Sequence, residues 1–72
     1  MKEPLILRVA PDKKLENWKV IQEGEKAPRA KGLKKEKALK LAAKLVQKDA
    51  RPAVVFVHKT RYIVERALQF SH

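Results

Sequence analysis

Hydrophobic and polar positions alternate in two stretches near the N-terminus. In residues 5–10 every second side chain is leucine or valine, and the intervening positions include Arg8. Residues 17–23 repeat the alternation, with tryptophan and valine opposite lysine and isoleucine. A period of two is typical of β-strands, so both stretches are predicted to be strands. The polar residues 11–16 between them predict a hairpin.

The pattern becomes helical in the middle of the chain. Residues 25–32 contain Pro28 and Gly32 and are expected to form a loop, with a short third edge strand near residues 29–31. Residues 33 or 34 to about 49 predict a helix that ends before Arg51-Pro52. Its predicted apolar face is wide and made of small and branched residues. These are Ala38, Leu39, Leu41, Ala42, Leu45 and Val46.

Two more strands are predicted after the helix. Residues 53–57 are almost entirely apolar and rich in valine, as in a strand at the centre of a sheet. A tight connection at residues 59–60 leads to a last strand over residues 62–68, and residues 69–72 show no pattern. One amphipathic helix must cover the apolar side of a sheet. We therefore predict an α+β fold with two layers, in which an antiparallel sheet of four to five strands, in the order β-β-(β)-α-β-β, packs on one helix.

Composition narrows the class of protein. The chain has 72 residues, which predicts a single small domain over residues 1–72 with an ordered core of about 5–68. Cysteine is absent, which excludes disulfides and thiolate metal sites. No apolar run approaches the roughly 20 residues of a membrane span, and Arg8 interrupts any signal-peptide core. We expect a cytoplasmic protein without a membrane span.

Positive charge is the main functional signal. The formal net charge is +10, and the densest stretch, residues 26–40, holds seven Lys or Arg against one acid, Glu36. Within the predicted helix four lysines share one stripe opposite the apolar face. These are Lys37, Lys40, Lys44 and Lys48. Such a stripe suits a polyanion, and it also suits a solvated helix face that keeps a small protein soluble.

The start of the helix is also basic. Lys34, Lys35 and Lys37 fall in the first turn, where the helix dipole is already positive. No Ser, Thr, Asp or Asn is placed to cap the free N–H groups. A phosphate would satisfy amides and charges together, whereas Glu36 and water would serve equally if nothing binds. Arg29 and Lys31 lie just before this turn, and Arg8, Lys19, Arg61 and Arg66 would extend the basic surface if they lie on the exposed side of the sheet.

Residues for catalysis are missing. With no cysteine and Ser71 as the only serine, a nucleophile with a positioned base is not expected, and neither a metal site nor a cofactor is predicted. His58 is interpreted as a hydrogen-bonded structural histidine or an exposed edge histidine. Among the aromatic residues, Trp18 and Phe56 are assigned to the core, and Tyr62 is predicted to be exposed.

The motifs together resemble a small bacterial domain family of unknown function. Its members show V-x-P, W-x-V, a helix with K-x-x-A-x-x-x-A-x-x-L, a V-x-V-H strand and a last strand with a central isoleucine. The matching residues, within 7–66, are Val9, Pro11, Trp18, Val20, Lys35, Ala38, Ala42, Leu45, Val55, Val57, His58 and Ile63. The chain departs from the family at Lys59-Thr60-Arg61, where members have Gly, and at Gly32-Leu33, where they have Thr or Asp. The resemblance implies the strand order and no activity.

Two functions follow from the charge. The first is a non-enzymatic protein that binds DNA or RNA through phosphate contacts and largely without regard to sequence. Its candidate residues are Arg29, Lys31, Lys34, Lys35, Lys37, Lys40, Lys44 and Lys48. The second is an interaction or regulatory module that binds an acidic protein, either as a monomer or as a homodimer formed through an exposed edge strand.

Overall fold

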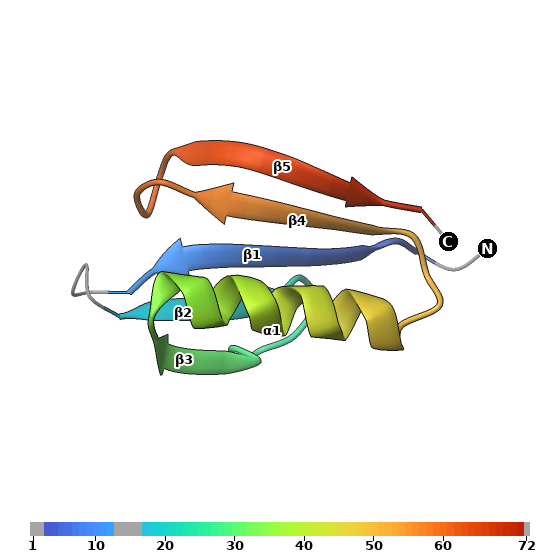
Figure 1. The fold of residues 1–72 in the computed structure, drawn as a ribbon, viewed down its shortest axis with the longest axis horizontal. Coiled ribbons are helices and arrows are strands. Elements are labelled where there is room, and N and C mark those ends of the chain that lie inside the picture. The colour runs from blue at the N-terminus through green and yellow to red at the C-terminus, as the bar shows by residue number, and fades with distance from the viewer. Residues whose placement is uncertain (1–2, 13–16, 72) are drawn as a thin grey trace.

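A computed structural model describes residues 3–12 and 17–71. The elements run β1 (Leu5–Pro11), β2 (Trp18–Gln22), β3 (Ala30–Leu33), α1 (Lys35–Lys48), β4 (Ala53–His58) and β5 (Val64–Phe70). The strands form one five-stranded sheet in the order β3-β2-β1-β4-β5, with α1 against one face (Figure 1). The α+β class and the two-layer arrangement are therefore confirmed. Strand β3 lies at one edge, as Pro28 predicted.

The sheet is mixed rather than antiparallel throughout. Strands β1 and β2, β2 and β3, and β4 and β5 pair antiparallel, but β1 and β4 pair parallel, with Leu5 opposite Ala53 and Val9 opposite Val57. The reason lies in the connection: α1 carries the chain along the length of the sheet, so β4 starts at the same end as β1 (Figure 1). The antiparallel expectation was wrong for this central pair. The loop predicted over residues 11–16 lies mostly outside the described residues.

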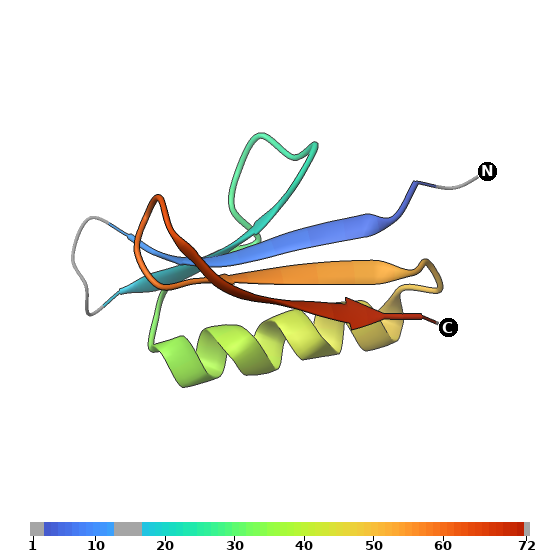
Figure 2. The ribbon, with the colours of Figure 1, turned by 90° about the horizontal axis from the view of Figure 1, so that it is seen from above.

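The core lies between α1 and the strands it covers. Every second residue of β1, β2 and β4 is buried on this side, and the helix contributes Ala38, Ala42 and Val46. These side chains are small, so the helix backbone can approach the sheet closely. Figure 2 shows α1 on one side of the sheet and the connection between β2 and β3 on the other. The buried cluster comprises Leu5, Leu7, Val9, Trp18, Val20, Ala38, Ala42, Val46, Ala53, Val55 and Val57.

The helix ends at a local polar link. The Asp49 carboxylate accepts hydrogen bonds from the Arg51 backbone N–H at 2.9 Å and from its guanidinium at 2.7 Å. These bonds raise the pKa of Arg51, so its charge does not change over any ordinary pH range. The helix stops before Arg51-Pro52, as predicted, and this link lies where the chain turns through residues 49–52 into β4.

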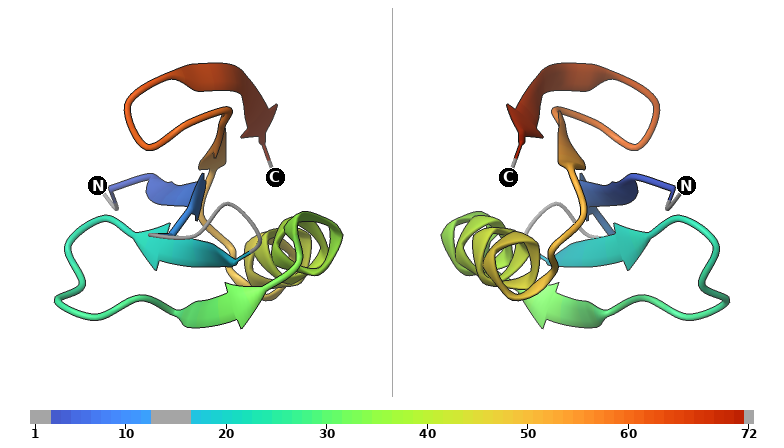
Figure 3. Two further views of the ribbon diagram at one scale, coloured as in Figure 1. Left: turned by 90° about the vertical axis from the view of Figure 1, so that its left-hand side faces the viewer. Right: turned by 90° about the vertical axis from the view of Figure 1, so that its right-hand side faces the viewer.

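Strand β5 differs from the rest of the sheet because α1 covers β1, β2 and β3 and leaves it open (Figure 3). Leu68 and Phe70 pack against the core, whereas the start of the strand and the turn before it are exposed. The strand extends to Phe70, so the expectation of an unpatterned tail from residue 69 was wrong. The extension of β5 is explained by the pairing of Phe70 with Ala53, because β4 offers β5 a partner over its whole length.

Candidate nucleic-acid interface

The four lysines at helical spacing form one surface, called here the lysine ridge: Lys37, Lys40, Lys44 and Lys48. All four are exposed, and the helix buries the opposite side through Ala38, Ala42 and Val46. The first three lysines and the half-buried Leu41 line a shallow depression of about 230 Å³. The amphipathic pattern therefore orients the ammonium groups as predicted.

No ridge lysine forms an ion pair among the residues that the structure describes. The ion pairs found there join Arg8 to Glu23, Lys19 to Asp12, Lys35 to Glu65 and Arg51 to Asp49. Glu36, the acid in the first turn, is exposed and forms none of them. Neighbouring lysines at i+3 and i+4 repel each other by a few tenths of a kcal/mol per pair. The ridge thus carries a local cost that an anion would relieve.

The N-terminus of α1 has no side-chain cap, as predicted. Lys34 occupies the N-cap with an extended backbone, and its side chain forms no capping hydrogen bond. Its carbonyl accepts from the Ala38 N–H at 2.9 Å, which closes the first helical turn. Lys34 is exposed at this end and adds its charge to the start of the ridge.

Lys35 does not belong to the ridge. It points toward the sheet, where its Nζ lies 3.3 Å from Glu65 and 5.2 Å from the centre of the Trp18 ring. The helical period explains this position, because Lys35 precedes Ala42 by seven residues and therefore falls on nearly the same side of the helix. Its ammonium group is already partnered by the fold.

Arg29 and Lys31 flank the ridge differently. Arg29 precedes β3, and its backbone N–H donates to the Val20 carbonyl at 2.8 Å. Arg29 and Lys48 line the same shallow depression of about 220 Å³ at the C-terminal end of α1. Arg29 therefore extends the ridge at that end, while Lys31 is exposed on the edge strand β3.

A second basic surface lies on the sheet face away from α1. Arg8 is its centre: its guanidinium contacts the Glu23 carboxylate at 3.0 Å, stacks 4.7 Å from the Phe56 ring centre and lies 3.3 Å from His58. Lys19 lies on the same face, opposite Ala10 in the ladder. Arg8 and Lys19 were expected to extend the basic surface if they lay on the exposed side of the sheet. Strand parity places them on that side, opposite the ridge, so they form a surface separate from it.

Arg66 and the aromatic side chains divide between the two faces of the sheet. Arg66 pairs with Val57, a core residue, and so projects toward the helix side. Trp18 is buried, and Tyr62 is exposed, as predicted. Phe56 is half-buried beneath Arg8 and outside the core cluster, so its assignment to the core was wrong. The apolar run 53–57 concealed the fact that alternate residues face opposite sides.

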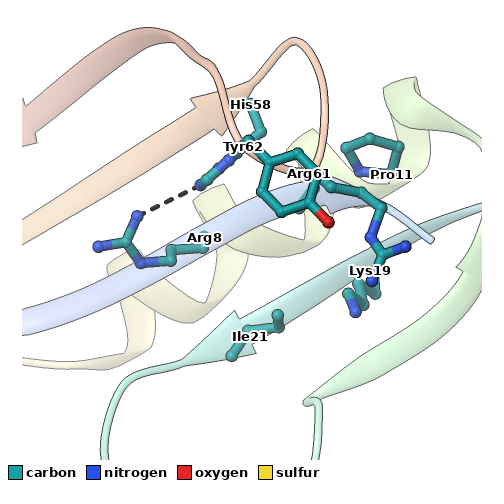
Figure 4. Close-up of a pocket in the computed structure, with 8 residues that line it drawn as sticks. Arg8, Pro11, Lys19, Ile21, His58, Arg61 and Tyr62 are labelled. Atoms are coloured by element: carbon teal, nitrogen blue, oxygen red, sulfur yellow. Dashed lines mark hydrogen bonds between the residues drawn. The ribbon is translucent and has the colours of Figure 1, made fainter.

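His58 is structural in part, and the alternative of an exposed edge histidine was wrong. Its side chain is buried, with 7% of the residue exposed, and Nε2 lies 3.3 Å from Nη1 of Arg8 (Figure 4). A guanidinium only donates hydrogen bonds, so Nε2 must accept. The proton of the neutral ring then sits on Nδ1, which is buried and has no hydrogen-bond partner among the described residues.

The described part of the chain contains neither a metal-binding cluster nor a helix that could span a membrane. Residues 3–12 and 17–71 contain no cluster of three or more His, Cys, Asp or Glu that could hold a metal ion. Within the same ranges, α1 is neither long enough nor apolar enough to cross a bilayer.

The fold and these surfaces define a small basic α+β protein that carries separate cationic surfaces on its helix and on its open sheet face. The chain belongs to the family described as "Uncharacterized protein conserved in bacteria (DUF2188)", whose model matches residues 7–66. Membership of an uncharacterized bacterial family, inferred from the motifs over these residues, is confirmed. No curated protein and no solved structure matches the chain.

Proposed function

We propose that this protein binds nucleic acid through the lysine ridge, without enzymatic activity and largely without regard to sequence. One observation carries the proposal: Lys37, Lys40, Lys44 and Lys48 are aligned, exposed and free of ion pairs among the described residues. Ammonium groups in a row on a helix supply point charges for phosphates and no base-specific geometry. Binding is then driven by release of counterions from the nucleic acid.

The expected salt dependence follows from the number of lysines. Four phosphate contacts on duplex DNA predict a slope of log K against log salt near about −3.6. Affinity should then fall by about a hundredfold between 50 and 200 mM salt. Ionic strength acts this strongly only where several charges bind together.

A charge-reversal experiment tests the proposal. The variant Lys37→Glu/Lys40→Glu/Lys44→Glu is compared with wild type for binding to duplex DNA, single-stranded DNA and RNA over a salt series. The control, Lys26→Glu/Lys59→Glu/Arg66→Glu, changes the formal net charge by the same amount, from +10 to +4, at exposed positions off the ridge.

Comparing the two variants distinguishes binding at the ridge from a general attraction by the net charge of the protein. We expect the ridge variant to lose binding by at least a hundredfold at 50 mM salt, and the control to lose much less. Equal losses from both variants would show that net charge alone attracts the nucleic acid. Absence of binding by wild type at 50 mM salt would reject the proposal outright.

A second function is favoured by a separate observation, the open edge of β5. Tyr62, Ile63 and Val64 are exposed at 86%, 57% and 42% beside this edge. An uncovered edge strand with apolar neighbours can pair with another chain. An acidic partner protein would suit the basic surface, whereas a second copy of this chain would pair along the β5 edge against the repulsion of like charges. Light scattering across a concentration series tests for the second copy, and a constant monomer mass at high concentration would exclude it.

A further inference from the structure

A pocket of about 240 Å³ opens on the sheet face opposite α1. Strands β1, β2 and β4 form its floor, and the turn between β4 and β5 forms one wall (Figure 4). This volume is below the usual range for drug-sized ligands. A larger ligand would be only partly enclosed and would extend over the rim, where Tyr62 is exposed. Its main lining residues are Arg8, Lys19, Ile21, His58, Arg61 and Tyr62.

The cations of this pocket are mostly held in place. Glu23 pairs with Arg8 at 3.0 Å, and Asp12 lies 4.0 Å from Lys19. Arg61 contacts the Tyr62 ring and forms no ion pair among the described residues. Three cations against two carboxylates leave a net charge of +1, centred on Arg61. A guanidinium is planar and has five N–H donors, which matches a phosphate group.

An aromatic surface lies beside this charge. Tyr62 is 86% exposed, and its ring centre lies 5.8 Å from the Arg61 guanidinium. Ala10, Pro11 and Ile21 add an apolar side to the same pocket. A simple anion would use the cations alone, whereas a ligand with both a flat ring and a phosphate would use every wall.

His58 supplies a buried donor at the same place. Because Nε2 accepts from Arg8, the Nδ1–H of the neutral ring is left without an acceptor among the described residues. A buried unsatisfied N–H is rare and costly in a folded protein. Solvent does not reach this atom, so His58 contributes to the pocket as a buried wall that fixes Arg8.

We propose that this pocket binds one nucleotide unit, with the base against Tyr62 and the phosphate at Arg61 and Lys19. The unit is either a free mononucleotide or one residue of a single strand, since both present the same base and phosphate. Stacking on an exposed tyrosine tolerates any base. The pocket lies on the face opposite the lysine ridge, so this inference stands independently of the proposed function.

Amide chemical shifts test the proposal on the whole protein. Thymidine 5′-monophosphate, a ten-residue oligothymidylate and inorganic phosphate are titrated separately while the ¹H–¹⁵N spectrum is recorded. We expect the first two probes to move the amides of Arg8, Ile21, His58 and Tyr62. Tighter binding of the oligonucleotide at these amides would identify a strand as the source, and equal or weaker binding would identify the free nucleotide.

Matched variants show which groups carry the binding. Tyr62→Ala removes the stacking surface and should weaken nucleotide binding at least fivefold, whereas Tyr62→Phe should retain it. Arg61→Gln should weaken it about five- to tenfold, while Lys59→Gln, which removes one charge from the same turn outside the pocket, should leave it within twofold.

Three results would overturn the inference. They are no shift at the pocket amides at millimolar nucleotide, equal affinity for inorganic phosphate and nucleotide, or binding unchanged by Tyr62→Ala. The titrations are repeated on Lys37→Glu/Lys40→Glu/Lys44→Glu. Pocket shifts that persist in this variant support the nucleotide site even if the ridge binds nothing, and pocket shifts that vanish with the ridge would count against a separate site.

Discussion

The lysine ridge and the sheet-face pocket are both basic, but they are built in opposite ways. The ridge takes all its charges from one helix, at regular spacing, and none of its four lysines is paired among the described residues. The pocket takes its charges from two strands and a turn, and carboxylates hold Arg8 and Lys19. An exposed row of ammonium groups suits a long polyanion. A fixed cluster beside an aromatic ring suits a single small ligand.

The comparison depends first on how α1 docks. Ala42 is 1% exposed against the sheet, while the next residue, Ala43, is exposed. Ala42→Asp buries an unpaired carboxylate and should destabilise the fold by about 3–5 kcal/mol. Ala43→Asp places the same group in solvent and should cost less than about 1 kcal/mol. Urea unfolding followed by circular dichroism measures both.

The result decides which side of the helix the ridge occupies. A protein of this size has a free energy of unfolding of roughly 4–11 kcal/mol, so Ala42→Asp should remove between about a quarter and all of that stability. Similar stabilities for the two variants would mean that α1 is not docked through Ala42. The alignment of the ridge lysines away from the sheet would then lose its basis.

A smaller effect is expected at Arg8, which organises the pocket. Arg8→Met removes a partly exposed ion pair, a cation–π contact and the donor to His58, and should cost about 1–2 kcal/mol. In wild type, two-bond ¹⁵N–¹H spectra of the imidazole in mildly alkaline buffer should show the proton on Nδ1. In Arg8→Met the Nε2–H form should gain population, because Nε2 no longer accepts a hydrogen bond.

An arginine elsewhere in the sheet provides the control. Arg66→Met removes an exposed guanidinium from β5 and should leave the His58 spectrum unchanged. A wild-type ring protonated mainly on Nε2 would contradict the hydrogen bond from Arg8. It would also remove the unsatisfied N–H from the pocket.

The smallest effect distinguishes Lys35 from the ridge. Lys35 and Glu65 are 40% and 45% exposed, so a double-mutant cycle with Lys35→Gln and Glu65→Gln should give a coupling below about 1 kcal/mol. In nucleic-acid binding, Lys40→Gln should reduce the salt slope by about 0.9, whereas Lys35→Gln should leave it unchanged. Equal reductions of the salt slope by the two substitutions would show that Lys35 also contacts nucleic acid and belongs to the ridge.

Sequence patterns predicted the features that depend on residues close together along the chain. The ridge, the uncapped helix start and most strands follow from periods of 3.6 and 2. The position of Lys35 was also available from the helical period, because it falls seven residues before Ala42. The prediction placed Lys35 with the other lysines of the first turn because of its charge and did not consider which side of the helix it faces.

The pocket could not be predicted in the same way. Arg8 and His58 are 50 residues apart and meet only because β1 pairs in parallel with β4. The predicted antiparallel sheet gave no reason to bring them together. Phe56 shows the same limit, because an almost continuous apolar run does not reveal which side chains face the open side. The register of the strands, which long-range pairing sets, decides both the contact between Arg8 and His58 and the face on which Phe56 lies.

The parallel pairing at the middle of the sheet also bears on how quickly the protein folds. Pro11 and Trp18 pair across 7 residues of sequence, but Leu5 and Ala53 pair across 48. Closing the longer loop costs about 1.7 kcal/mol more in chain entropy, enough to slow that step roughly twentyfold relative to the first hairpin. The β1–β4 ladder is therefore expected to limit the rate of folding. During synthesis, the strand made first waits for its second neighbour until residues 53–58 have been added.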